Sequence, residues 1–202
     1  MNDEFLIIAI TPPMFFDGEV ERINNILSSN EVNFVHIRKP YASAKKIEEL
    51  ILSIKPELRC RLKLHDRFEL AEKYNLGGVH LNLRNPEYST TRLPKDKWNK
   101  KETICGSNFT ISKSLHSLDD FESVTGLDYI FLSPVFDSIS KSGYKASFDL
   151  EKISSFIRGK NVIALGGVTP DKFPFLKSTG FLGAALLGYF FPEVLNEVEI
   201  TT

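Results

Sequence analysis

The chain has 202 residues and carries 25 Lys and Arg against 26 Asp and Glu, a formal net charge of −1. This length suits one sizeable domain, and the balanced charge gives no reason to expect nucleic acid or a membrane surface as a partner. The first apolar run, residues 5–10, is too short for a signal peptide or a membrane span, so we expect a soluble, cytoplasmic protein. Two cysteines, Cys60 and Cys105, do not make a disulfide framework, and we expect buried free thiols in a reducing compartment.

Short apolar runs recur along the chain and predict strands. In order they are 5–10, 34–38, 61–65, 78–81, a weaker run within 104–114, 129–132, 162–165 and 183–187. Segments with helical features separate most of them: 43–54 with Ser43 as N-cap, 117–124 with Ser117 as cap, and 168–176 with Thr169 as cap and Pro170 at the first helical position.

Strands that alternate with helices imply right-handed parallel units, and eight units in a chain of this length predict a single TIM (β/α)8 barrel over residues 1–202. A doubly wound open sheet is the alternative. Against it, the first strand is followed by TPPMFFDG (11–18) rather than a glycine-rich dinucleotide loop, and the sequence has no GxGxxG motif. The fourth unit is the weakest, because residues 85–102 are polar and predict only a short helix or a loop.

All four histidines, His36, His65, His80 and His116, lie within or just after these apolar runs. In a TIM barrel they would gather at the C-terminal mouth, where such barrels place their chemistry, and we expect one or two to be functional. Alternation along 34–38 puts His36 and Arg38 on one face. The sequence has no HxH, HExxH or CxxC spacing, so we do not expect a zinc centre, and without GxSxG we do not expect a serine hydrolase.

The last two strand ends predict a phosphate site. The stretches ALGGVTPD (164–171) and GAALLGYFF (183–191) place Gly166, Gly167 and Gly188 where the backbone can approach an anion. The segment SPVFDSISKSGYK (133–145) adds the hydroxyls of Ser138 and Ser140 and the ammonium of Lys141 beside them. The residues assigned to substrate and phosphate binding are Ser114, Ser138, Ser140, Gly166, Gly167, Leu187, Gly188 and His65.

Five motifs in order resemble the thiamine phosphate synthase/TenI family over nearly the whole chain. HIRKP is similar to the family's QLREK, LHDRFELA to NDRxxLA, GGVHL to DGVHLGQ, DYIFLSPVFDSISK to DYIGxGPVFxTxTK, and ALGG with GAALLG to the closing AIGG and GVAVVS. The resemblance implies a TIM barrel, usually a homodimer, that binds a thiazole phosphate at its mouth.

The family holds two chemistries. The synthase joins a pyrimidine pyrophosphate to thiazole phosphate with Mg²⁺, and the TenI branch moves a proton to aromatise a thiazole carboxylate phosphate. This sequence has His36 for the synthase glutamine, Pro40 for a lysine, His65 for an asparagine and Asn85 for the second metal aspartate, while Asp66 keeps the first. Arg38 remains, and Lys63 is a candidate to substitute for the missing lysine.

From these departures we expect a TenI-like tautomerase that needs no cofactor. The resemblance implies that His116 is the acid–base group, and that Lys141 is retained for catalysis. His36 and Arg38 would hold the substrate carboxylate. A synthase using Mg²⁺ on Asp66 is the alternative, and a non-catalytic paralogue that binds thiazole phosphate or thiamine phosphate is a second one.

Overall fold

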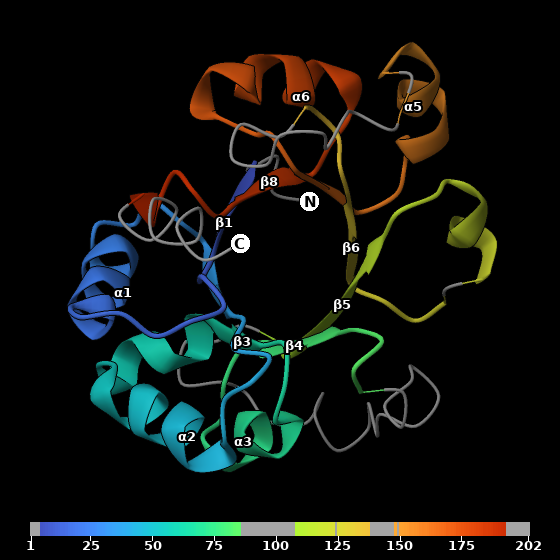
Figure 1. Ribbon diagram of the computed structural model, residues 1–202. Coiled ribbons are helices and arrows are strands. Elements are labelled where there is room, and N and C mark those ends of the chain that lie inside the picture. Colours follow the sequence, from blue (N-terminus) through green and yellow to red (C-terminus); the bar gives the residue numbers. More distant parts are fainter. Residues whose placement is uncertain (1–4, 86–107, 124, 138–147, 149, 193–202) are drawn as a thin grey trace, which may run out of the picture.

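Eight parallel strands close into a barrel in chain order (Figure 1). The computed structural model describes residues 5–85, 108–123, 125–137, 148 and 150–192. Each strand lies in or overlaps a predicted run, and β1 pairs with both β2 and β8, which confirms the TIM barrel. The strands are β1 (Leu6–Ile10), β2 (Phe34–Ile37), β3 (Leu62–Leu64), β4 (Gly78–Leu81), β5 (Thr110–Leu115), β6 (Tyr129–Leu132), β7 (Val162–Leu165) and β8 (Gly183–Leu186).

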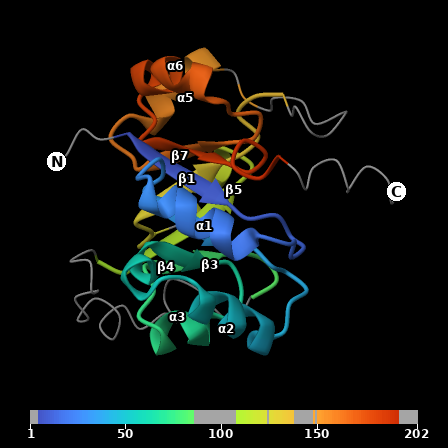
Figure 2. The ribbon, with the colours of Figure 1, turned by 90° about the vertical axis from the view of Figure 1, so that its left-hand side faces the viewer.

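Helices surround the strands (Figures 1 and 2). Ser43 accepts a hydrogen bond from the Lys46 amide at the start of the second helix, as predicted. The Ser117 hydroxyl accepts a hydrogen bond from the Asp119 amide at 3.2 Å, as expected of a cap, but the segment that follows is a short 3-10 segment rather than an α-helix. Thr169 stands at the N-cap position with Pro170 first in its segment, as predicted, although the Thr169 side chain makes no capping hydrogen bond. The α-helices are α1 (Glu19–Ser28), α2 (Ala44–Ser53), α3 (Phe68–Lys73), α5 (Leu150–Ile157) and α6 (Phe173–Thr179), and the 3-10 segments are η1 (Pro56–Arg61), η2 (Asp119–Ser123) and η3 (Pro170–Lys172).

The core is divided into an outer and an inner part by the alternation of side chains along each strand. Val35 and Ile37 of β2 belong to the large outer cluster between the strands and the helices. The inner cluster fills the barrel with Ile8, Phe131 and Ile163 among others. His36, between the two outward residues, therefore points into the barrel, as the sequence predicts.

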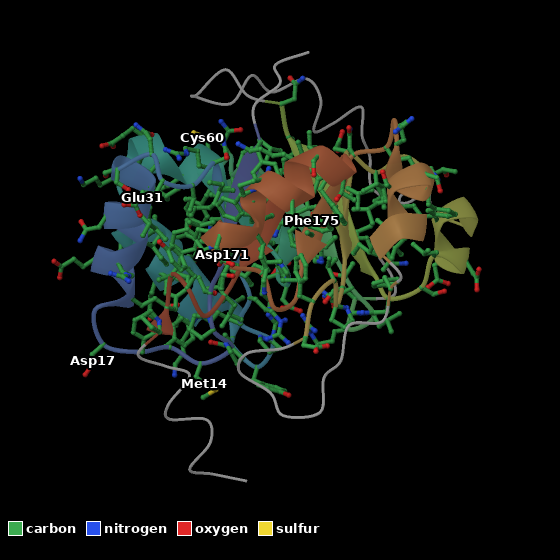
Figure 3. All side chains as sticks on the ribbon, turned by 90° about the horizontal axis from the view of Figure 1, so that it is seen from above. Met14, Asp17, Glu31, Cys60, Asp171 and Phe175 are labelled. Carbon is green, nitrogen blue, oxygen red and sulfur yellow. The ribbon has the colours of Figure 1, made fainter. Side chains whose placement is uncertain are left out.

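Figure 3 separates the two ends of the barrel. Met14 and Asp17 follow β1 and lie at the C-terminal end, whereas Glu31 and Cys60 precede β2 and β3 and lie at the opposite end. Cys60 is buried and disulfide-bonded, so the prediction of a free thiol is wrong for this residue; Cys105 lies outside the described residues. Within the described part of the chain, no helix has the length and apolar character to span a membrane.

A buried ion pair fixes the loop after β1. The Lys39 amine donates to Glu19 Oε1 at 2.5 Å and also to the carbonyl oxygens of Pro12 at 2.9 Å and Met14 at 2.7 Å. Both charged side chains are almost fully buried. The Lys39 amine is thus used to hold the β1–α1 loop. It does not replace the lysine that the family has at the position of Pro40.

Candidate active site

A pocket of about 600 Å³ opens at the C-terminal end of the barrel. Strand ends and the turns after them supply its walls, as expected for a TIM barrel. Its polar and charged lining includes Arg38, His65, His80, Arg84, Lys113 and His116. Phe131, Leu165 and Leu187 contribute apolar surface.

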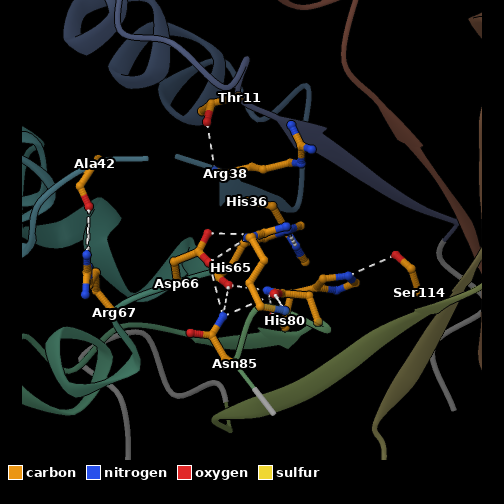
Figure 4. A network of polar contacts seen from close by, with 12 residues as sticks. Thr11, His36, Arg38, Ala42, His65, Asp66, Arg67, His80, Asn85 and Ser114 are labelled. Carbon is orange, nitrogen blue, oxygen red and sulfur yellow. Dashed lines mark hydrogen bonds and ion pairs between the residues drawn. The ribbon is translucent and has the colours of Figure 1, made fainter. Parts of the chain in front are cut away.

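Three of the four histidines meet at this end of the barrel (Figure 4): His65 and His80 line the pocket, and His36 is fully buried against them. Leu64 pairs with Val79, so the next residues on these neighbouring strands, His65 and His80, lie level with each other. Their rings stack with centroids 4.2 Å apart. His36 Nδ1 lies 3.0 Å from His65 Nε2. If one nitrogen is taken from each ring, the three nitrogens all lie within 4.8 Å of one another.

Hydroxyl groups surround the outer edges of this cluster. The Tyr129 hydroxyl lies 2.9 Å from His36 Nε2. The hydroxyls of Ser112 and Ser114 lie 2.9 Å and 3.0 Å from Nδ1 and Nε2 of His80. Ser114, predicted to contact substrate, thus lines the pocket and also orients His80.

Burial keeps the cluster uncharged. Desolvation is the largest cause that lowers the pKa values of His36 and His65 well below their ordinary range and that of His80 to about 3. The positive charges of Arg84 and Arg38 lower the pKa of His80 further. The three imidazoles are therefore neutral at physiological pH.

Lys63 lies deeper in the barrel, level with His36 on the neighbouring strand. Its amine donates to the Gly77 carbonyl at 2.8 Å and the Thr110 hydroxyl at 2.5 Å, and lies 4.0 Å from the centre of the Phe34 ring. These partners stand at the N-terminal ends of their strands, so Lys63 points away from the mouth. The expectation that it replaces the missing lysine at position 40 is wrong.

Asp66 is fully engaged by neighbouring donors (Figure 4). Arg84 donates from Nε at 3.1 Å and from Nη2 at 3.0 Å, and the Asn85 amide donates at 3.1 Å. Mg²⁺ prefers carboxylate and water oxygens in octahedral geometry. Here Asn85, an uncharged amide, stands where the family has its second metal-binding aspartate. The guanidinium of Arg84 already neutralises the charge of Asp66. These residues do not fit the Mg²⁺ ion that the family resemblance implies.

His116 follows β5, is exposed, and lines the pocket apart from the buried cluster. Its Nδ1 lies 2.9 Å from the Ser133 carbonyl oxygen. A carbonyl only accepts hydrogen bonds, so in the neutral ring Nδ1 carries the proton and Nε2 keeps a free electron pair. This is the tautomer that a general base at Nε2 requires.

The two glycine loops stand beside the pocket. Leu165 and Leu187 line it, and Gly166 and Gly167 follow Leu165 with φ of 90° and 61°. A Cβ on Gly167 would lie 2.1 Å from the Asp137 carbonyl oxygen, so this turn requires glycine. Phosphate binding here, including at Gly188, stays a prediction. Ser138, Ser140 and Lys141 lie outside the described residues.

Sequence reasoning missed Arg84 and Lys113 as pocket cations and Tyr129 as a partner of His36. Arg84 lies outside the five motifs that carry the family resemblance. The signal that could have identified Tyr129 is alternation along β6: Tyr129 and Phe131 share the inward face.

The chain matches the family model described as thiamine monophosphate synthase over residues 7–189. It is 26% identical to a thiamine-phosphate synthase of Bacteroides fragilis over 180 residues, which cover 82% of this chain and 83% of that protein. A crystal structure of thiamine phosphate pyrophosphorylase from Bacteroides thetaiotaomicron is similar with a TM-score of 0.70 and 30% identity, covering 91% of this chain and 83% of that one.

The fold is also similar to that of a thiamine phosphate pyrophosphorylase from Pyrococcus furiosus, with a TM-score of 0.65 and 18% identity over 96% of both chains. This second structure supports the fold alone. The family match covers almost all of the described barrel, from β1 to the turn after β8. The chain belongs to the thiamine monophosphate synthase family.

Proposed function

We propose that the protein is a transferase of the thiamine-phosphate synthase kind, which joins a pyrimidine pyrophosphate to a thiazole phosphate and releases pyrophosphate. The names of the relatives support this function over the tautomerase that we expected from the sequence. The observation that carries the proposal is the charge of the pocket. Arg38, Arg84 and Lys113 line it against a single lining carboxylate, Asp120, among the described residues.

A pocket of this charge suits a polyanionic substrate. A departing pyrophosphate concentrates negative charge, and fixed cations that face it stabilise the transition state. Guanidinium groups bind phosphate oxygens in a bidentate manner. We infer that Arg38 neutralises the leaving group. Arg84, held on Asp66 through Nε and Nη2, has further N–H groups to offer at the carboxylate where the family resemblance puts Mg²⁺, and we infer that it takes over part of that work.

The test is an assay of the purified protein with the pyrimidine pyrophosphate and thiazole phosphate, with and without added Mg²⁺. We expect thiamine phosphate to form, with little dependence on Mg²⁺. Arg84→Gln should lower kcat/KM by about tenfold or more, because a charged hydrogen bond contributes about 1.5–3 kcal/mol. The matched control is Arg67→Gln, whose guanidinium donates to the Ala42 carbonyl and does not line the pocket.

Two outcomes would count against this proposal. If no thiamine phosphate forms under either condition, the transferase function is wrong. If thiamine phosphate forms only with Mg²⁺ and Arg84→Gln behaves as the control does, Arg84 does not replace the ion.

His116 favours a second candidate function, the tautomerase of the TenI branch. Its protonated Nδ1 is held by the Ser133 carbonyl, which leaves Nε2 in the pocket wall ready to accept a proton. An imidazole is suited to proton transfer near neutral pH. The substrate would be the thiazole carboxylate phosphate, with Arg38 contacting its carboxylate.

His116→Gln separates the two candidates. If the protein is a tautomerase, this variant should aromatise the thiazole carboxylate phosphate about 10²–10⁴-fold more slowly, with little change in substrate affinity. The reaction is followed by ultraviolet absorbance of the aromatic product. A wild-type protein that leaves this substrate unchanged removes the second candidate, and a variant with the full wild-type rate removes His116 from the chemistry.

A further inference from the structure

The buried histidine cluster is not accounted for by either candidate reaction. We propose that His36, His65 and His80 form a binding site for a divalent transition-metal ion of the zinc class, with three imidazole ligands and one position open to the pocket. This proposal does not depend on which reaction the pocket catalyses.

The positions of the nitrogens suit one shared ion. Two imidazole nitrogens that bind one tetrahedral zinc at about 2.0 Å lie about 3.3 Å apart. His36 Nδ1 and His65 Nε2 are 3.0 Å apart, and the ligand atoms of all three histidines lie within 4.8 Å of one another. The rings of His65 and His80 are stacked with an angle of 21° between their planes. Because an imidazole binds a metal through a lone pair in its ring plane, one of these two rings has to turn out of the stack for all three nitrogens to reach one ion.

In His36 and His80, the outer nitrogens have the partners that metal-bound histidines usually need, because such partners fix the ring and its tautomer. The Tyr129 hydroxyl lies at His36 Nε2, the nitrogen that faces away from His65. Two serine hydroxyls, from Ser112 and Ser114, lie at the nitrogens of His80. A bound ion would replace the contact between His36 and His65 and one of the two serine contacts.

The ligand type selects the class of metal. Imidazole suits zinc, copper, nickel and cobalt, whereas Mg²⁺ and Ca²⁺ require oxygen ligands. His65 and His80 line the pocket, so the open position of the ion would face the space that Arg38 and Arg84 also line. These two cations favour an anion as the fourth ligand, such as a phosphate or carboxylate oxygen of a substrate.

The same contacts also exist in a cluster that is held only by hydrogen bonds, so metal binding has to be measured directly. The full chain, stripped with a chelator, is titrated with Co²⁺ and followed by visible absorbance. We expect one equivalent to bind with the strong d–d bands of a four- or five-coordinate site, Zn²⁺ to abolish them by displacement, and azide to shift them by occupying the open position.

Variants locate the site. His36→Gln and His65→Asn each remove one imidazole, and each should weaken Co²⁺ binding at least tenfold while circular dichroism shows a folded barrel. The matched control is His116→Gln, since His116 lines the same pocket outside the cluster. This variant should bind Co²⁺ as the wild type does.

A measurement on the unchanged protein makes the result independent of whether the variants fold. X-ray absorption of the Zn²⁺-loaded wild type should show three imidazole ligands at about 2.0 Å. The proposal is overturned if the wild type binds neither Co²⁺ nor Zn²⁺ at micromolar concentrations. It is equally overturned if the absorption spectrum lacks three imidazoles, or if both cluster variants bind Co²⁺ as tightly as the control.

Discussion

Lys63 is a fully buried lysine, and burial lowers its pKa from 10.5 to about 7. Between these two pH values the unfolded chain binds more protons than the folded protein, so the free energy of unfolding should rise with pH from about 7 to about 10 and level off outside this range. Each unit of pKa difference contributes about 1.4 kcal/mol. Lys63→Met should flatten this rise, measured by urea unfolding at pH 7 and pH 10.

Lys45→Met is the control for this experiment, because the Lys45 side chain is 84% exposed. It should leave the pH dependence of the unfolding free energy as it is in the wild type. If the unfolding free energy of Lys63→Met rises between pH 7 and pH 10 by as much as that of the wild type, Lys63 does not cause the pH dependence.

For single residues, the sequence predicted the direction of a side chain but not the contacts that it makes across strands. Alternation along β2 predicted that His36 points inward, because that depends only on local geometry. The sequence predicted that the four histidines gather at the mouth. It did not predict that His36, His65 and His80 form a buried cluster without His116, since motif rules search for ligands close in sequence and these come from three successive strands. Their approach depends on the register across the strands, which the sequence does not state directly. Likewise, alternation placed Lys63 in the barrel but could not tell which end its amine reaches.

The loop between β1 and α1 depends on the buried pair of Lys39 and Glu19. Lys39→Met leaves the Glu19 carboxylate buried without its counter-charge, which should cost about 3–5 kcal/mol of unfolding free energy. The double variant Glu19→Leu/Lys39→Met should recover most of this loss, because replacing a buried pair by apolar groups is often neutral. Guanidinium unfolding of each variant measures both effects.

An exposed pair provides the comparison. Lys73 donates to Glu48 at 2.6 Å with the lysine side chain 60% exposed. Lys73→Met should cost no more than about 1 kcal/mol, as surface pairs do. Equal losses in Lys73→Met and Lys39→Met would mean that burial does not set the strength of the Lys39 pair.

Strands were easier to predict than helices. Most barrel strands are short apolar runs, because both their faces are covered, and composition reveals them. The exception is β5, whose sequence TISKSL is mostly polar. The helix α2 was also predicted, since its apolar spacing and Ser43 cap act together. The segment after Ser117 is only a 3-10 turn, and Thr169 stands at an N-cap position without a side-chain hydrogen bond, because short connections follow the packing around them more than their own propensities.

For the whole molecule, the order of strands and helices predicted the barrel, and five motifs predicted the family. The choice between synthase and tautomerase could not be reached in the same way. It depends on how a few charged side chains are arranged in the folded protein. The ion pair between Arg84 and Asp66 occupies the carboxylate that the resemblance assigns to Mg²⁺, and this pair is visible only in the folded chain.

The chemistry of the mouth is divided between two consecutive lengths of chain. The buried imidazoles, Arg38 and Arg84 all come from β1–β4 and the turns after them, whereas His116 and the glycine loops come from β5–β8. The first half supplies the three imidazoles and two of the three pocket cations, and the second half supplies Lys113, the exposed His116 and the glycine loops. Hydrogen bonds also cross between the halves, because Tyr129 of β6 meets His36 and two serines of β5 meet His80. A substitution in β5 or β6 can therefore reorient imidazoles that β2 and β4 supply, so the two halves tune one mouth together.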